Sequence, residues 1–276
     1  MGDIFTQGSI IEYIRSNKYP NIKCQGIVIS ARCDLAQEKI KNFHCLSAMS
    51  IEEWIYEVLF ESVVNERKNS TLGSIKKYCE KKDMDFDTLC RMGKEDFKTV
   101  LLKSDSLGKH QSASNIIDEW ERVSMILNSN NKEEKRNFLK NNRKLMENKL
   151  KALYNSAFPK FAFIPEKAYS KGKSSVKGLV VDLQDVIQLD INVKKPILAY
   201  EYDYKVEKSK EKREYINKYF FFDSDSDFVI VEDVIESPWI EYLLQMFANS
   251  FMRIGVDNAL EYEIQDFCTE FLGDDI

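Results

Sequence analysis

A cation, a thiol, a carboxylate and an imidazole occur close together near the N-terminus. Arg32, Cys33 and Asp34 are consecutive, and His44 lies on a predicted strand shortly after them. The thiolate is the nucleophilic form of cysteine, and a neighbouring cation or base favours it. A hairpin that brings His44 to Cys33, with Asp34 orienting the imidazole, would give a Cys33-dependent hydrolase or transferase. Without that approach, Cys33 is a small buried side chain and Asp34 caps a turn.

Two sequence patterns resemble parts of metal-binding sites, but both are incomplete. Cys24 and Cys45 flank the same region, but their spacing includes no close cysteine pair of the kind that zinc sites use. Residues 223–227 (DSDSD) resemble the start of a calcium loop, yet Phe228 replaces the sixth-position glycine and Val234 the final glutamate. We therefore expect neither a metal nor another cofactor.

Two basic segments could contact phosphate groups. Residues 132–151 hold eight Lys and Arg against three Glu, and residues 170–175 form a Lys/Gly/Ser loop that lacks the order of a P-loop. The alternative for the first segment is a solvated helix face, and the alternative for the second is a flexible loop. The candidate nucleic-acid-binding residues are Lys140, Arg143, Lys144, Lys171, Lys173 and Lys177.

The charge is distributed unevenly along the 276 residues. The net charge is -5, but residues 223–276 hold fourteen Asp and Glu against one Arg, which gives -13 there and leaves +8 for residues 1–222. Such asymmetry predicts two electrostatic faces, one of which could meet nucleic acid, or two halves that attract each other.

The composition excludes several classes of protein. Apolar residues make up 43% and charged residues 31%, and no apolar run approaches the roughly 20 residues that span a bilayer. The N-terminus lacks the basic start and apolar stretch of a signal peptide. We therefore expect a cytoplasmic protein with reduced cysteines and no contact with a membrane.

The hydrophobic pattern changes period along the chain. Residues 1–50 and 156–235 are rich in short β-type runs, whereas residues 51–155 show helical spacing throughout. Residues 236–276 predict two terminal helices. The sequence thus predicts a split β-domain, a helical insertion at 51–155, and a C-terminal helical pair packed on the β-domain.

Local signals define some of these elements. Ser50 and Glu53 have the spacing of a capping box. Ser237 and Pro238 predict the start of the first terminal helix. Residues 132–154 predict one basic helix. Residues 196–200 predict a strand, and the runs 219–222 and 228–231 predict a hairpin.

The β segments resemble the PemK/MazF-like toxin family. The segments that correspond to the family's pattern are Gln7–Ile11 at the first strand, Gly26–Ser30 at the second, Leu46–Ser50 after the third, Ser175–Asp190 as the later apolar strand, and residues 238–252 as the closing helix. The resemblance covers about 100 residues. It implies an SH3-like barrel that binds RNA and, in toxins, cleaves it.

The family's cleavage residues are only partly matched. It places an Arg just before the second strand and a Thr or Ser after the third. Lys23, Cys24 and Gln25 occupy the first place here, and Ser47 or Ser50 could occupy the second. Lysine can hold a phosphate but lacks the bidentate fork of arginine.

Three functions remain open. The chain could be a binding or adaptor module for RNA or for a dedicated protein partner. It could also form a homodimer. It could be a metal-independent endoribonuclease in which Lys23, Arg32 and Ser47 position the phosphate. It could be the Cys33-dependent enzyme. We expect an α+β fold, a small bent antiparallel SH3-like barrel split by the helical insertion, in a cytoplasmic protein related to bacterial defence or toxins.

Overall fold

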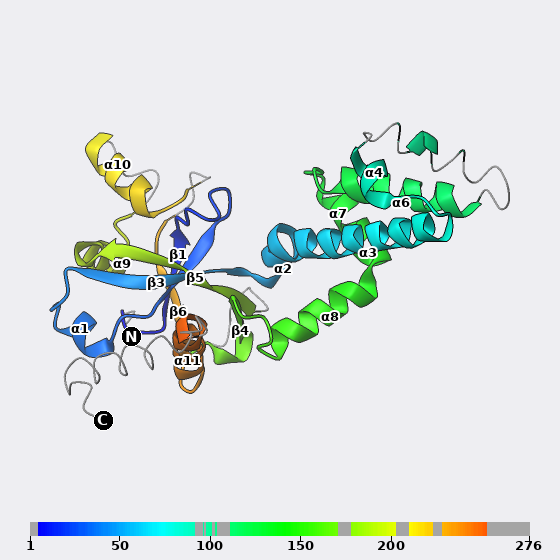
Figure 1. Ribbon diagram of the computed structural model, residues 1–276. Coiled ribbons are helices and arrows are strands. Elements are labelled where there is room, and N and C mark those ends of the chain that lie inside the picture. The colour runs from blue at the N-terminus through cyan, green and yellow to red at the C-terminus, as the bar shows by residue number, and fades with distance from the viewer. Residues whose placement is uncertain are drawn as a thin grey trace, which may run out of the picture. The chain divides into compact units, whose positions relative to one another are not determined.

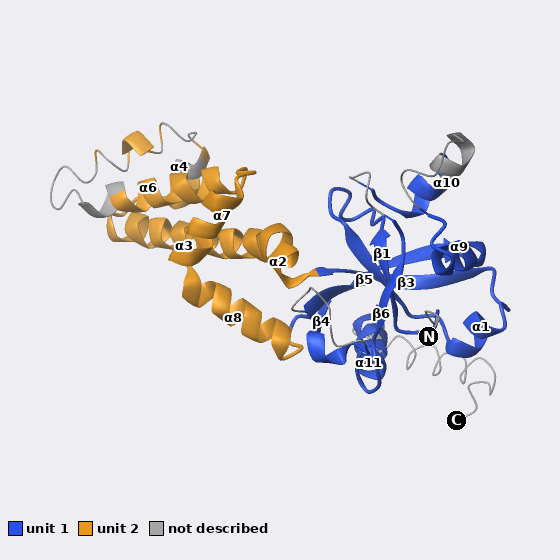
Figure 2. Ribbon diagram, turned by 180° about the vertical axis from the view of Figure 1, so that it is seen from behind, with its two compact units in different colours: residues 1–49, 158–276 blue, residues 50–157 orange. Residues whose placement is uncertain are grey.

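The protein divides into two compact units, which Figure 2 colours separately. A computed structural model describes residues 5–91, 96, 98–100, 103, 111–170, 178–202, 210–222 and 228–252. Residues 1–49 and 158–276 form the first unit, which we call the sheet unit, and residues 50–157 form the second, the helical unit. Each unit is described by itself.

Six strands form one sheet in the sheet unit, in the order β4-β5-β3-β2-β1-β6 (Figure 1). The strands are β1 (Ser9–Ile14), β2 (Cys24–Val28), β3 (Asn42–Ser50), β4 (Phe161–Pro165), β5 (Gly178–Asp190) and β6 (Val231–Val234). The pairs β1–β2, β1–β6, β2–β3 and β4–β5 are antiparallel. Their Val and Ile content suits a pleated sheet. An α+β fold with an antiparallel sheet is therefore confirmed.

The sheet is curled. The register of β1 against β2 shifts between Ile11 and Ile14, and Tyr13 within this irregularity has a φ of 59°. Such bulges bend a strand and increase its twist. Beyond the two edge strands, Tyr169 after β4 forms an antiparallel bridge with Ile235 after β6. The curl therefore brings the segments that follow both edge strands together.

Both faces of the sheet are covered. Val28 and Cys45 belong to one buried cluster, and their neighbours Ile27 and Leu46 belong to the other, because successive side chains along a strand point to opposite faces. The first cluster includes residues of α1 (Arg32–Ala36), η4 (Ile191–Val193), α9 (Lys194–Leu198) and α10 (Lys210–Tyr219). The second includes residues of η3 (Glu166–Ala168) and α11 (Trp239–Met252).

The helical unit begins at a capping box. Ser50 Oγ accepts a hydrogen bond from the Glu53 N–H at 3.2 Å, and the Ser50 N–H donates to Glu53 Oε2 at 3.2 Å, as predicted. The helices of this unit are α2 (Ile51–Trp54), the π-helix η1 (Ile55–Leu59), α3 (Phe60–Lys81), α4 (Phe86–Arg91), α6 (Gln111–Ile126), α7 (Lys132–Asn141) and α8 (Arg143–Tyr154).

Three sequence-based expectations about elements were wrong. Residues 196–200, predicted as a strand, lie in and just after α9. The predicted hairpin does not form: α10 runs to Tyr219, Phe220 bridges Ile14, and β6 pairs with β1. The expected single helix at 132–154 is interrupted at Asn142, which has φ -112° and ψ 31°. In each case a tertiary contact or a local break overrode the apolar pattern.

One further expected helix starts at a different residue, and three expected features lie in residues that the structure does not describe. The first terminal helix begins at Trp239, after the expected start at Ser237 and Pro238. The second terminal helix, the lysine loop at 171–177 and the acidic run 223–227 lie outside the described residues.

Candidate functional site

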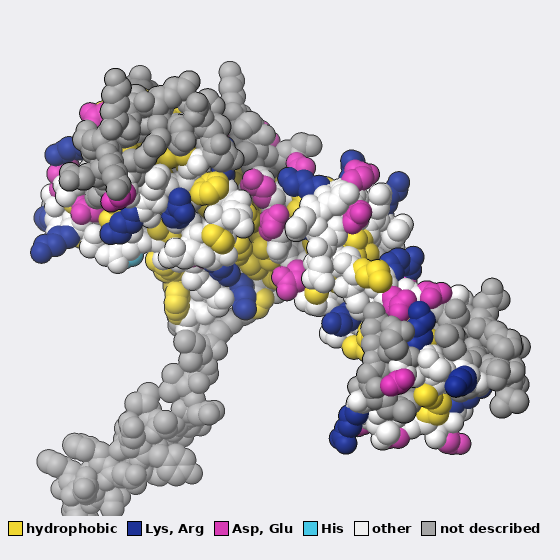
Figure 3. Space-filling view, turned by 90° about the horizontal axis from the view of Figure 1, so that it is seen from above, with side chains coloured by type: hydrophobic (Ala, Val, Ile, Leu, Met, Phe, Trp, Pro, Cys, Tyr) yellow, Lys and Arg dark blue, Asp and Glu magenta, His cyan; other side chains and the backbone are white. Residues whose placement is uncertain are grey.

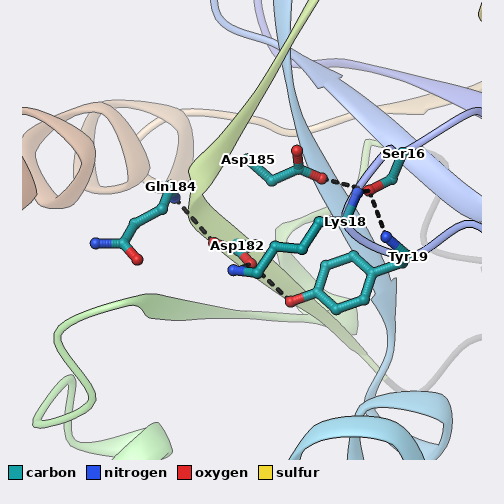
Figure 4. A network of polar contacts seen from close by, with 6 residues as sticks. All are labelled: Ser16, Lys18, Tyr19, Asp182, Gln184 and Asp185. Atoms are coloured by element: carbon teal, nitrogen blue, oxygen red, sulfur yellow. Dashed lines mark hydrogen bonds and ion pairs between the residues drawn. The ribbon is translucent and has the colours of Figure 1, made fainter.

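A buried carboxylate on β5 anchors the β1–β2 connection, residues 15–23 (Figure 4). The side chain of Asp182 has no exposed surface. Its Oδ2 accepts a hydrogen bond from Tyr19 Oη at 2.6 Å and forms an ion pair with Lys18 Nζ. The backbone N–H of Gln184 donates to Asp182 Oδ1 at 2.9 Å. A buried charge needs such partners, so this network holds the connection against the sheet.

Ser16 provides a second anchor in the same connection. Its Oγ accepts hydrogen bonds from the N–H groups of Lys18 and Tyr19, at 3.1 and 3.0 Å. The Ser16 hydroxyl donates to Asp185 Oδ2 at 2.6 Å. Asp182 and Asp185 of one strand thus hold Ser16, Lys18 and Tyr19, which are more than 160 residues away in the chain.

This network predicts a loss of stability at alkaline pH. Burial, together with the neighbouring Asp182 carboxylate, raises the pKa of Tyr19 well above its usual value. Above pH of about 10 the unfolded chain releases the tyrosine proton while the folded protein retains it. We expect the Tyr19 contribution to the free energy of unfolding to be constant below that pH and to fall above it, in denaturant titrations between about pH 8 and 11.

The variant Tyr19→Phe tests the assignment of this effect. Burial also raises the pKa of Tyr169 and of the Cys45 thiol, and both act in the same direction. The variant should therefore reduce the alkaline slope without removing it. An unchanged slope would show that Tyr19 ionises equally well in both states.

Cations and aromatic rings alternate around the same connection. Lys23 Nζ lies 5.2 Å from the ring centroid of Tyr13, and Arg15 Cζ lies 5.6 Å from that of Phe221. Lys18 Nζ lies 5.5 Å from the centroid of Tyr19. We call Tyr13, Arg15, Lys18, Tyr19, Lys23 and Phe221 the basic–aromatic patch.

The backbone of the patch is unusual at Tyr13. A positive φ is rare for an aromatic residue, and such conformations gather at functional sites. Arg15 shows a second unusual feature: its buried Nε has no hydrogen-bond partner, and no carboxylate pairs with its guanidinium within the described part of the chain. Within the described residues, the patch therefore offers a charge that no carboxylate neutralises.

The residues predicted for thiol chemistry lie on two different elements of the sheet unit. Arg32, Cys33 and Asp34 lie on the short helix α1, with Arg32 and Cys33 exposed. Cys33 Sγ contacts Asp34 Oδ1 at 3.7 Å. His44 lies on β3, where its N–H donates to Ser30 Oγ at 2.9 Å. Among the described residues no hydrogen bond joins His44 to Cys33. The Cys33 thiol contacts the Asp34 carboxylate and not an imidazole.

The residues predicted for RNA cleavage also lie in different environments. Ser47 is fully buried on β3 opposite Gly26, and its hydroxyl has no hydrogen-bond partner among the described residues. A hydroxyl without exposed surface cannot touch a substrate in this conformation. Lys23 is half-buried in the basic–aromatic patch, and Arg32 is exposed on α1. Of the three, Lys23 is the one placed beside further cations and rings.

The basic helices of the helical unit border an apolar groove of about 610 Å³. Of the predicted nucleic-acid-binding residues, Lys140 and Arg143 line this groove, and Lys144 is exposed but is not part of its lining. Lys171, Lys173 and Lys177 lie outside the described residues. The apolar lining consists of Ile51, Ile55, Tyr56, Leu139, Met146 and Leu150, which we call the groove floor.

A second hollow in the helical unit is polar and internally neutralised. It has a volume of about 590 Å³ and lies where α3 faces α6. Glu119 pairs with Arg67 at 2.9 Å, and it also pairs with Arg122. Because one carboxylate engages both guanidinium groups, this hollow offers less free charge to a ligand than the groove does.

The charges on the face drawn in Figure 3 are mixed. In the view of Figure 3, Lys and Arg side chains (dark blue) and Asp and Glu side chains (magenta) are interspersed. An anionic ligand must therefore find a local cluster of cations and not a uniformly basic face.

Neither metal-ligating clusters nor membrane-spanning helices appear in the part of the chain that the structure describes. No three or more His, Cys, Asp or Glu side chains there are arranged to hold a metal ion. No described helix combines the length and apolar character needed to cross a membrane. No protein-family model, curated protein or solved structure matches this chain.

Proposed function

We propose that the sheet unit binds single-stranded nucleic acid, with RNA favoured, through the basic–aromatic patch. The observation that carries the proposal is the group of three cation–ring pairs around one anchored connection. Unpaired bases stack on aromatic rings and on arginine planes, while Lys and Arg neutralise phosphates. Arg15 combines both properties, since its guanidinium lies against Phe221 without a carboxylate partner among the described residues.

In this proposal the curled sheet is an SH3-like barrel of the PemK/MazF kind, interrupted by a helical insertion. The chain is a cytoplasmic protein related to bacterial defence or toxins, and it acts by binding. One observation supports binding over RNA cleavage: Ser47, a residue predicted to take part in cleavage, is fully buried.

The test is a binding and cleavage assay on one gel. The full chain is incubated with labelled single-stranded RNA and with duplex DNA, without metal, over a salt series. We expect the RNA to be bound more tightly than duplex DNA and to remain uncut, with affinity that falls as salt rises. Cleavage lost in Lys23→Ala would favour the ribonuclease alternative, and absence of RNA binding would contradict the proposal.

Variants of the patch distinguish stacking from charge. Arg15→Ala and Lys23→Ala should each weaken RNA binding and lower the slope against salt by about one unit. Tyr13→Asn should weaken it by about tenfold with little change in that slope, because asparagine tolerates a positive φ but provides no ring. Lys39→Ala is the matched control, since Lys39 is an exposed lysine of the sheet unit outside the patch. Equal losses in this control would show non-specific attraction.

A further inference from the structure

The groove of the helical unit is lined by residues of α2, η1, α7 and α8. The break at Asn142 ends α7 and starts α8, so Leu139 and Met146 approach the groove from different helices. Across from them, Ile55 and Tyr56 open the π-helix η1, whose wider turn alters the helical register. Lys135 Nζ donates to the Tyr56 carbonyl oxygen at 3.4 Å, which ties α7 to η1.

The groove floor is apolar and partly open to solvent. Leu139 is 4% exposed and forms its buried part, while Ile51, Ile55, Met146 and Leu150 are half-buried. Methionine adapts to varied apolar ligands, and contiguous apolar surface on a folded unit marks an interaction site. This floor fits aliphatic or aromatic side chains better than phosphates.

The rim of the groove carries three cations, Arg136, Lys140 and Arg143, and two carboxylates, Glu52 and Glu147, so cations are in slight excess. Arg136 and Lys140 are exposed there, and neither has an acidic partner among the described residues. Arg143 is also on the rim, where it pairs with Glu147 at 2.7 Å. Two unneutralised cations beside an apolar floor complement a ligand that has carboxylates next to apolar side chains.

Nucleic acid fits this chemistry less well. Non-specific binding of single strands relies on aromatic rings that stack bases along a basic track. Tyr56 is the one aromatic residue of the groove lining, and Lys132 Nζ already lies 5.9 Å from its ring centroid. An amphipathic helix instead places apolar residues at positions i, i+4 and i+7 into such a groove and directs its acidic residues to the rim.

We infer that the groove of the helical unit is a docking site for an acidic amphipathic helix of a partner protein. The apolar stripe of that helix contacts the groove floor, and its carboxylates pair with Arg136 and Lys140. This site is separate from the RNA-binding patch proposed for the sheet unit. A chain with both sites would connect an RNA to a protein partner.

A designed peptide tests the groove in the full chain. The probe is a fluorescent peptide of about 16 residues with Leu and Phe at i, i+4, i+7 and i+11 and with Glu between them. We expect saturable binding that weakens with salt. Leu150→Glu should reduce the affinity by about tenfold or more, because it places a carboxylate in the apolar floor. Lys140→Glu should reduce it by about fivefold.

The controls separate docking from general charge attraction. Lys144→Glu makes the same charge change on an exposed residue outside the groove lining, and we expect it to retain most of the affinity. A peptide with Lys in place of each Glu should bind at least about tenfold more weakly. Circular dichroism of each variant verifies that the helical unit is folded.

Three results would overturn the inference. They are equal binding of the Lys-substituted peptide, equal losses in Lys140→Glu and Lys144→Glu, or displacement of the peptide by single-stranded RNA with the same dependence on Leu150. The last result would assign the groove to nucleic acid. Arg15→Ala should leave peptide binding unchanged, so failure of the RNA proposal and failure of this inference can be told apart.

Discussion

Replacement of Lys18 by methionine should lower the free energy of unfolding by about 2–3 kcal/mol. Asp182 has no exposed side-chain surface, and the ion pair to Lys18 is its only pairing with a cation in the part of the chain that the structure describes. The variant keeps the hydrogen bonds from Tyr19 and Gln184 but leaves a buried charge without its counter-ion. This loss of stability is smaller than the full cost of breaking a buried ion pair because the Lys18 side chain is 43% exposed.

A double-mutant cycle with Asp182→Asn isolates the charge. Asparagine carries no charge, its carbonyl oxygen can accept from the Gln184 N–H, and its NH2 group can donate to Tyr19 Oη, so Lys18→Met in that background should cost less than about 1 kcal/mol. Urea denaturation of the four proteins gives the coupling energy. Equal costs of Lys18→Met in both backgrounds would show that the lysine contributes by packing alone.

The same variant should weaken RNA binding. Lys18 and Tyr19 belong to the basic–aromatic patch, and their connection to Asp182 positions the segment between β1 and β2. If the patch binds RNA, Lys18→Met should lower the affinity for single-stranded RNA more than Lys23→Ala does, because it also releases the connection from Asp182. Its salt slope should fall by about one unit, as in Lys23→Ala.

Features that depend on neighbouring residues could be predicted from the sequence. The capping box of Ser50 and Glu53 involves two residues three positions apart. The apolar run of Gly26–Ser30 predicted a strand, and β2 covers Cys24–Val28. The next two residues also bond to β3: the Ile29 N–H donates to the His44 carbonyl oxygen, and Ser30 Oγ accepts from the His44 N–H. Periodicity and capping are local properties, so one sequence is sufficient to recognise them.

The Asp182 network could not be predicted because its members are far apart in the chain. Lys18 and Tyr19 lie in a polar loop that resembles many solvated loops, and nothing local connects them to β5. One signal was present: Asp182 interrupts the apolar run Leu179–Leu183. A carboxylate in a buried strand needs a partner, but the sequence does not identify which cation provides it.

The groove was not predicted from the sequence, although two of its lining residues were expected to contact nucleic acid. The basic character of residues 132–151 indicated a binding surface, and Lys140 and Arg143 lie on the groove. The apolar floor was missed because the single helix expected there left no place for it. Asn141 and Asn142 were the available signal for a break, since asparagine is a weak helix former.

Replacement of Trp54 by alanine should produce the largest loss of stability in the helical unit, about 3–5 kcal/mol. Trp54 is fully buried, and among the described residues it is the largest side chain that is. Alanine removes most of that apolar surface and leaves a cavity that the surrounding helices can only partly fill. Trp54→Phe should cost about half as much, because most of the buried ring surface remains.

The measurement is urea denaturation followed by the helical circular dichroism signal and by the fluorescence of Trp120, which lies in α6 of the same unit, with Trp239 of α11 replaced by phenylalanine in every protein. Tyr154→Ala is the control, since this ring is 56% exposed and its removal should change the free energy of unfolding by less than about 0.5 kcal/mol. Trp54 ends α2 directly before Ile55 and Tyr56, so its loss should also weaken peptide binding in the groove. A Trp54→Ala protein with unchanged stability would mean that the start of the helical unit is not packed as the structure places it. The groove inference would then lose its support, while the basic–aromatic patch, in the other unit, would retain its own.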